Sequence, residues 1–275
     1  MAIDPGARIG AVHLTVADLG RLVSFYETRL GLAVRQRDSR AAWLGAGGPD
    51  LLVLHEAPTA RRVPGTTGLY HFAVLVPTRR DLARSLRRLV DTRTTLQGAA
   101  DHGVSEALYL GDPESNGIEI YRDRPRAEWP VVAGQLRMGT DALDLDGLLS
   151  ELEAEGDTRD AASMPPATTI GHVHLHVADL AATEEFYAGV LGFELTQRFG
   201  QSAYFFAAGG YHHHVGANIW AGAGAPPPPP GALGLDHFEI VLPPKMGSLE
   251  RNPYRAPFSE IRDPSGNAMR FVDGD

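Results

Sequence analysis

Two histidines and one glutamate stand in strand-like segments, where a polar side chain needs an explanation. His13, His71 and Glu119 each alternate with apolar neighbours, such as Val12 and Leu14 around His13. Because side chains alternate across a strand, these neighbours point to the opposite face. If the apolar faces pack on helices, the three polar groups face one concavity. Two imidazoles and one carboxylate suit Fe(II) with open positions. The alternative is three separately hydrogen-bonded side chains.

The stretch from residue 101 to 122, DHGVSEALYLGDPESNGIEIYR, places several reactive groups close together in the chain. His102 stands in a polar loop, Tyr109 near the end of a strand, and Glu119 inside the next strand. The residues between the two strands are typical of a tight turn. Burying an unpaired carboxylate is expensive, so Glu119 needs a partner if it is buried. The other interpretation is an exposed edge strand with Glu119 in water.

The chain contains a strong internal repeat. Residues 170–195 align with residues 9–34 at an offset of 161, and 13 of 26 positions are identical. The alignment pairs His13 with His174, and the dipeptide at 25–26 with the one at 186–187. The repeat predicts a duplicated domain.

Each copy reads as strand, helix and further strands, twice in succession in the first copy. We therefore predict an N-terminal domain over 1–122, which holds the metal site, a connector with one helix over 123–168, and a shortened C-terminal domain over 169–275. Residues 244–260 show too little helical pattern to repeat the helix that follows Asp81.

The second copy lacks one part of the predicted metal site. Its segment 263–271 mirrors 112–120 and places Arg270 where the first copy has Glu119. Arginine cannot bind a cation, so the N-terminal site is expected to be the active one. The tract at 212–214 leaves open a second set formed by His174, His214 and His237, although a polar strand that faces an interface is the favoured interpretation, because a histidine tract is only compositional evidence for a metal.

Composition excludes several classes of protein. The formal net charge of −9 argues against a nucleic-acid surface. The absence of cysteine excludes disulfides and thiolate metal sites, and it is compatible with the cytoplasm, where we expect the protein. No apolar run is long enough to span a bilayer, and the N-terminal residues show no signal region, so we expect no membrane partner.

These motifs resemble the vicinal oxygen chelate superfamily, which includes glyoxalases, bleomycin resistance proteins and extradiol dioxygenases. The segment with His102, Tyr109 and Glu119 resembles the signature of extradiol ring-cleavage dioxygenases, with departures at Ala100 and Ser115 that remove no functional group. Together with YHHHVGANIW at 211–220, the likeness is greatest to two-domain catechol 2,3-dioxygenases. It implies an α+β fold: tandem duplicated domains of paired βαβββ modules that form cupped, mixed sheets.

The resemblance also implies a chemistry. The expected cofactor is Fe²⁺, with Mn²⁺, Ni²⁺ or Zn²⁺ left open, and the partners are a small aromatic diol and O₂. The implied ligands are His13, His71 and Glu119, while Tyr109 would hydrogen-bond a substrate oxygen and His102 would orient or protonate the substrate. A homo-oligomer is compatible with the sequence.

Two other functions share this fold. A glyoxalase-like isomerase or epimerase would need a further carboxylate base in the pocket. A non-catalytic protein that sequesters an antibiotic would need no metal. The resemblance favours the dioxygenase.

Overall fold

The chain folds as four strand-rich units, described in this computed structural model for residues 2–153, 163–244 and 260–274. The first unit comprises β1 (Arg8–Val16), α1 (Leu19–Phe25), the π-helical turn η1 (Tyr26–Leu30), β2 (Ala33–Arg37), β3 (Ala41–Gly45) and β4 (Asp50–Glu56). The second comprises β5 (Gly68–Leu75), α2 (Arg79–Asp91), β6 (Gly98–Asp101), β7 (Ser105–Gly111) and β8 (Gly117–Asp123).

The second half of the chain repeats this pattern. The third unit comprises β12 (Thr169–His176), α4 (Leu180–Glu184), the π-helical turn η3 (Glu185–Val190), β13 (Glu194–Phe199), β14 (Ala203–Ala207) and β15 (Val215–Asn218). The fourth comprises β16 (Gly234–Leu242), β17 (Glu260–Arg262) and β18 (Ala268–Asp273). The stretch predicted to lack a helix, 244–260, lies almost wholly outside the described residues.

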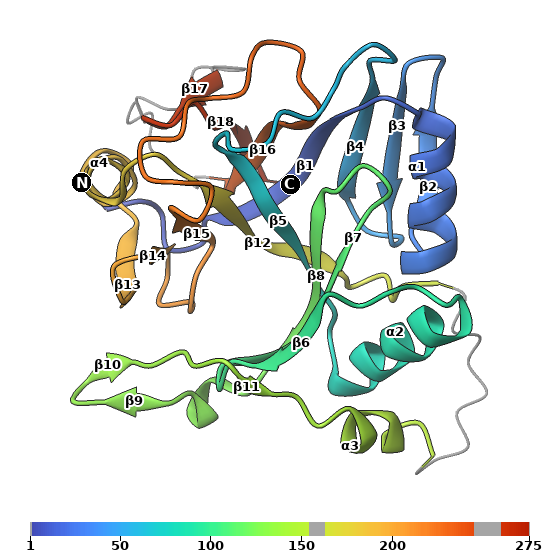
Figure 1. Ribbon diagram of the computed structural model, residues 1–275. Helices are drawn as coiled ribbons and strands as arrows, with labels where there is room; N and C mark the ends of the chain where they lie inside the picture. Colours follow the sequence, from blue (N-terminus) through green and yellow to red (C-terminus); the bar gives the residue numbers. More distant parts are fainter. Residues whose placement is uncertain (1, 154–162, 245–259, 275) are drawn as a thin grey trace.

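The connector contains the short helix that the sequence predicts. Its elements are η2 (Arg126–Glu128), β9 (Val131–Val132), β10 (Gln135–Leu136), β11 (Asp141–Ala142) and α3 (Leu145–Ser150). Helix α3 begins at the N-cap Asp144, whose side chain accepts a hydrogen bond from Gly147 N. In Figure 1, α3 lies beside α2 below the strands.

Two curved sheets organise the four units, and each sheet takes strands from both halves of the chain (Figure 1). One sheet has the order β17-β18-β16-β1-β4-β3-β2, so the first unit joins the fourth. The other has the order β11-β6-β7-β8-β5-β12-β15-β14-β13, so the second unit joins the third. At the joints, β1 runs antiparallel to β16 and β5 runs antiparallel to β12.

The predicted fold class is confirmed, because paired units form cupped sheets of mixed strand direction. The pairing of units differs from the expected chain order. The ranges 1–122 and 169–275 do not each form their own sheet, because β1 and β5 bond to β16 and β12 across that division. The predicted domain ranges therefore describe the repeat in the chain, and each cup combines one unit from either half.

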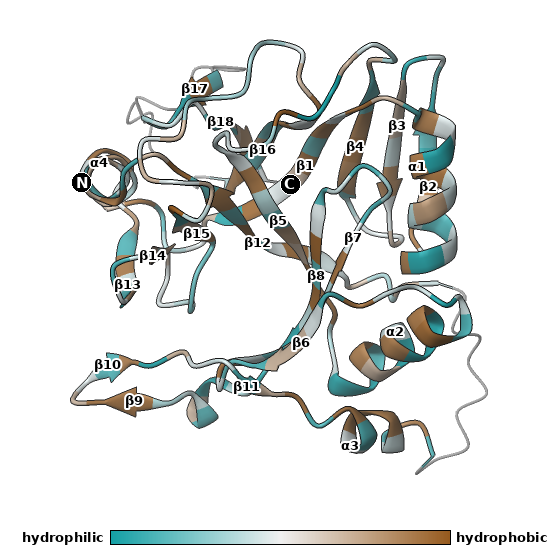
Figure 2. Cartoon of the chain, in the orientation of Figure 1, coloured by the Kyte–Doolittle hydropathy of each residue, from teal (hydrophilic) through white to brown (hydrophobic). Residues whose placement is uncertain are grey.

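The hydrophobic pattern explains why the strands present polar residues to the cups. Val12, Leu14, Phe72 and Ile118 are at most 1 % exposed and belong to one core that all four units share. Helices α1 and α2 carry alternate hydrophobic and hydrophilic bands, as Figure 2 shows. Among the described residues, no helix is both long and apolar enough to cross a membrane.

A tyrosine in each π-helical turn links one sheet to the other. The hydroxyl of Tyr26 donates to Asp112 Oδ2 at 2.7 Å, and that of Tyr187 donates to Asp263 Oδ2 at 3.3 Å. Both aspartates also accept two backbone N–H groups of their own turn. The Phe-Tyr dipeptide that recurs in the sequence thus supplies a buried tyrosine–aspartate hydrogen bond in each half of the chain. We call each of these two hydrogen bonds a clamp.

Removing the first clamp should destabilise the protein more than removing the second. Tyr26→Phe removes the hydroxyl that donates to the buried Asp112 at 2.7 Å. Loss of this hydrogen bond should lower the free energy of unfolding by about 1–3 kcal/mol. Tyr187→Phe removes a longer bond and should cost less. Urea unfolding of both variants and the parent measures this, and a larger loss in Tyr187→Phe would contradict the clamp assignment.

Candidate functional site

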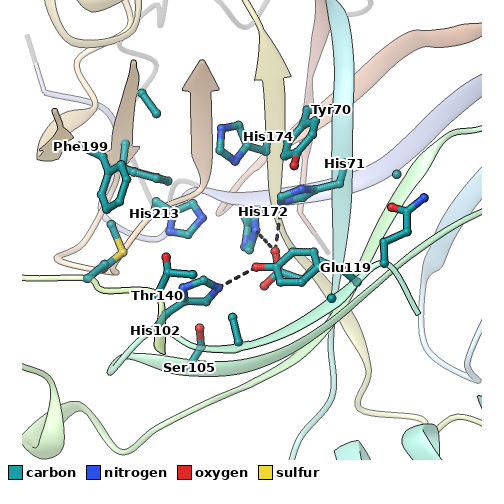
Figure 3. A pocket seen from close by; sticks show the side chains of 18 of the residues that line it. Tyr70, His71, His102, Ser105, Glu119, Thr140, His172, His174, Phe199 and His213 are labelled. Atoms are coloured by element: carbon teal, nitrogen blue, oxygen red, sulfur yellow. Dashed lines mark hydrogen bonds and ion pairs between the residues drawn. The ribbon is translucent and has the colours of Figure 1, made fainter. Parts of the chain in front are cut away.

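A buried carboxylate lies between two buried imidazoles at the centre of the second sheet. Oε2 of Glu119 is 3.0 Å from Nε2 of His71 and 3.1 Å from Nε2 of His172. All three residues are buried, and Figure 3 shows them converging on one point. Among the described residues, these three form the cluster of His, Asp and Glu side chains that could hold a metal ion.

Three adjacent strands position this cluster. β5 lies between β8 and β12, and Ala73 of β5 is in register with both Glu119 and His172. Since Ala73 follows His71 by two residues, its small side chain shares the His71 face and leaves room for the larger groups. β8 approaches β5 closely at Gly117, where a Cβ atom would lie 2.0 Å from the carbonyl oxygen of Tyr70.

The electrostatics favour an ionised Glu119 carboxylate and a neutral His172 imidazole. Burial lowers the pKa of His172 to about 4, although Glu119 opposes the shift. Burial raises the pKa of Glu119, but the contacts with His172 and His71 outweigh this and hold that pKa well below its usual range. This is the protonation state in which histidine and glutamate bind metals.

The donor set fits a divalent cation. Oε1 of Glu119 is buried without a hydrogen-bond partner in the described structure, and Nε2 of His71 lies close to the carboxylate without the alignment of a hydrogen bond. Such unsatisfied buried groups need an explanation, and a bound ion supplies one. Two histidines and one carboxylate with open positions are typical of non-haem Fe(II) oxygenases.

A cavity of about 390 Å³ opens over this cluster. His102, Tyr109 and His213 all line it. Nδ1 of His102 donates to the carbonyl of Gly139, which can only accept, so Nε2 of the neutral ring accepts from the Tyr109 hydroxyl at 2.7 Å. Burial, and then Glu119, raises the pKa of Tyr109 well above its usual value, so its hydroxyl stays protonated.

A hydrogen-bonded chain fixes the ring of His213. Nε2 of His212 lies 2.8 Å from Oδ1 of Asp123, and the carboxylate must accept from an N–H there. In the neutral ring, Nδ1 of His212 then accepts from Nδ1 of His213 at 2.8 Å. Nε2 of His213 is left as an unprotonated nitrogen, to which no described residue bonds. Burial lowers the pKa of His213 well below its usual value, so this nitrogen is a free base.

The structure brings together most, but not all, of the predicted residues. His71, Glu119, His102 and Tyr109 all line the cavity. His13 does not reach it, because β1 belongs to the other sheet, where His13 pairs in register with His237. Its Nδ1 lies 3.0 Å from Nε2 of His55 and its Nε2 lies 3.5 Å from Oε1 of Glu239. His172 occupies the third position.

His172 was missed for a definable reason. The repeat aligns His174 with His13, so it predicts a role for His174. His172 aligns with Ala11, so the repeat predicts none for it. The signal was the run HVHLH at 172–176, in which alternate histidines share one face of a strand. His174 does line the cavity, but the set of His174, His214 and His237 does not assemble in the described structure, because His237 stacks on His13 in the other sheet.

Arg270 has the position that the repeat predicts, without a ligand role. It lies on β18, and Nη2 is 3.1 Å from Oε2 of Glu260 on β17. The matching position of the second sheet is Glu119 on β8. The two cups therefore differ in the sign of the charge at equivalent sites.

Comparison with known proteins gives a consistent result. The model of the Glyoxalase/Bleomycin resistance protein/Dioxygenase superfamily matches residues 8–120 and 169–243. The catechol-2,3-dioxygenase of Bacillus subtilis (strain 168) is 47% identical over 247 residues, which are 88% of this chain and 85% of that protein.

Solved structures with the same fold are more distant in sequence. A putative dioxygenase from Bacillus subtilis has a TM-score of 0.61 at 14% identity, covering 99% of this chain and 86% of that one. Glyoxalase I from Zea mays has a TM-score of 0.51 at 16% identity, covering 86% and 74%. At these identities the likeness shows the fold alone.

The first site prediction separates His172 from His13 as the third ligand. Since outer contacts of a metal ligand alone are worth about 10–100-fold in affinity, loss of a ligand in His172→Ala should weaken Fe(II) binding at least about 100-fold. His13→Ala should bind iron as the parent does. Iron analysis after anaerobic reconstitution measures this, and the reverse pattern would restore the set His13, His71 and Glu119.

A second prediction concerns acid stability. Burial, and then nearby histidines, lowers the pKa of His214 to about 4, and its Nδ1 accepts from Ala208 N. In the unfolded chain the pKa of this histidine is ~6.5, so the unfolded state binds the proton more readily than the folded state. The stability contributed by the neutral His214 is therefore fully present above pH ~6.5 and is lost as the pH falls toward ~4. His214→Asn keeps an acceptor but does not titrate. Between pH 7 and 5 it should lose about 2 kcal/mol less stability than the parent in urea unfolding, and an equal loss would contradict the assignment.

Proposed function

Because the chain belongs to the Glyoxalase/Bleomycin resistance protein/Dioxygenase superfamily, we propose that it is an Fe(II)-dependent extradiol dioxygenase of a catechol-like aromatic diol. The observation that carries the proposal is the cluster of His71, Glu119 and His172 beneath a cavity lined by acid–base groups. The name of the Bacillus subtilis relative supports the same reaction class. We infer a role in the breakdown of aromatic compounds.

In the proposed reaction, one carbon–carbon bond beside the two hydroxyls breaks and both atoms of O₂ enter the ring-opened product. When bound, Fe(II) would supply Lewis acidity and one-electron chemistry. The chain supplies the proton transfers. His213 offers an unprotonated Nε2 and takes a proton from a substrate hydroxyl, while His212 and Asp123 hold its tautomer.

Tyr109 and His102 form a second proton-accepting pair in the cavity. Because the Tyr109 hydroxyl donates to His102 Nε2, its oxygen retains a lone pair for a substrate hydroxyl. A proton that this oxygen receives can move on to His102. The cavity thus holds two separate proton acceptors, His213 and the Tyr109–His102 pair, which suits a diol.

The isomerase alternative is less well supported by the described residues. It needs a carboxylate base in addition to the metal ligand, and Glu119 is the carboxylate that lines this cavity. The likeness to glyoxalase I from Zea mays concerns the fold alone. A binding protein without metal would leave the buried Glu119 Oε1 without a partner.

Changes to the acid–base groups should spare the metal and lower turnover. His213→Gln and His102→Ala each remove a proton acceptor that is not a ligand, so each should keep the iron content of the parent and lower catechol turnover about 10²-fold or more. Iron content and oxygen uptake are measured on the same sample, with His13→Ala as a histidine control outside the cavity.

Two outcomes would count against the proposal in different ways. Normal turnover in His102→Ala would remove His102 from the mechanism, and likewise for His213. No oxygen uptake by the parent with any catechol, despite full Fe(II) loading, would favour the isomerase.

A further inference from the structure

The exposed aromatic residues that the structure describes gather at the cavity. Tyr70, Phe199 and Trp220 are 40 %, 44 % and 49 % exposed, and they are the aromatic members of the set of exposed large hydrophobic residues that the structure describes. All three line the cavity above Glu119. Exposed aromatic groups that concentrate around one cavity indicate a binding surface for an apolar ligand.

These side chains form two walls. Tyr70 and Trp220 pack edge to face with centroids 5.1 Å apart, on the side of His174. Phe199 lies on the other side of the cluster, beyond His213, as Figure 3 shows. A substituent on the aromatic ring would therefore meet apolar or aromatic surface on leaving the polar centre.

The cavity is larger than the smallest substrate requires. Its volume of about 390 Å³ corresponds to roughly 13 water molecules at ~30 Å³ each. Catechol and O₂ together have about ten non-hydrogen atoms, each smaller than a water molecule's share of the liquid. Space remains for a substituent of several atoms.

No Lys or Arg side chain lines this cavity in the described part of the chain, and its one carboxylate is Glu119. The guanidinium groups beneath the sheet are paired with acids: Glu106 lies 2.9 Å from Arg79, 2.7 Å from Arg122 and 3.2 Å from Arg124. A carboxylate on a ring substituent, away from the metal site, would meet no cationic side chain among the lining residues, so its desolvation would not be compensated.

The neighbouring polar cavity does not supply the missing cation. Its arginines are Arg62 and Arg262, and it shares Tyr70, Gln97 and Gly117 with the proposed active site. Arg262 pairs with Glu260. Nε of Arg62 donates to Glu114 O, and Nη2 donates to Asn116 Oδ1. These two hydrogen bonds hold the guanidinium group of Arg62 in the neighbouring cavity and away from the proposed active site. The net charge of −9 adds a long-range repulsion toward anionic substrates.

We propose that the substrate is an uncharged catechol carrying an apolar alkyl or aryl substituent, which packs between the walls of Tyr70 with Trp220 and of Phe199. This inference rests on the proposed dioxygenase function and adds the substrate class. The recognition is by exclusion of charge as well as by apolar contact.

The test compares matched substrates on the Fe(II)-reconstituted protein. Methyl 3,4-dihydroxybenzoate and 3,4-dihydroxybenzoate differ chiefly in charge, so kcat/KM from oxygen uptake should be at least about tenfold higher for the ester. An acid that reacts as well as the ester would overturn the inference and leave the dioxygenase function standing. No uptake with any catechol would overturn the dioxygenase function, and this inference with it.

Variants of the walls test the apolar contact. Phe199→Ala and Trp220→Ala remove exposed side chains, so folding should be preserved. In each, the ratio of kcat/KM for 3-phenylcatechol to that for catechol should fall about tenfold, and in Phe199→Leu, which keeps apolar area, it should fall less. An unchanged ratio in both alanine variants would overturn the inference.

Discussion

The buried carboxylate of Glu119 is the constraint on which the described structure of the site depends. A charge that is 2 % exposed must be compensated, and the compensation comes from the adjacent strand β5 and from β12, the strand beyond it. His71 on β5 belongs to the same half of the chain, whereas His172 on β12 belongs to the other half. The site therefore exists only where β5 and β12 pair. This explains why neither half of the chain can form the cluster alone.

The crossed pairing of units also places the acid–base groups. Tyr109 and His102 come from the second unit, on β7 and in the loop between β6 and β7, while His213 comes from the third unit just before β15. Since these units share a sheet, their polar groups line one cavity. The tyrosine–aspartate bonds of Tyr26 and Tyr187 run between the sheets, so the same crossed arrangement that builds the cavity also clamps it.

The local sequence pattern predicted the strands and the faces on which their side chains lie, but it could not predict which strands pair. Alternation placed His71 and Glu119 on one face because periodicity is a property of each strand alone. It placed His13 correctly on its own strand, but which strands become neighbours depends on the packing of all four units. The signature segment indicated His102, Tyr109 and Glu119 together because they lie on the consecutive strands β7 and β8 and in the loop just before them. His172 is separated from that segment by the connector, so no local pattern joined them.

The other cup shows how a related arrangement of histidines can exist without the metal cluster. There, the position equivalent to Glu119 carries Arg270, whose guanidinium group pairs with Glu260. His13 has His55 as a neighbour at one ring nitrogen and Glu239 near the other, and His237 has Asp236. These polar groups meet one another, although Nε2 of His13, like Oε1 of Glu119, is buried without a hydrogen-bond partner in the described structure. The two cups therefore differ chiefly in the carboxylate: the cluster with Glu119 is suited to take up a cation, whereas the guanidinium group of Arg270 cannot bind one.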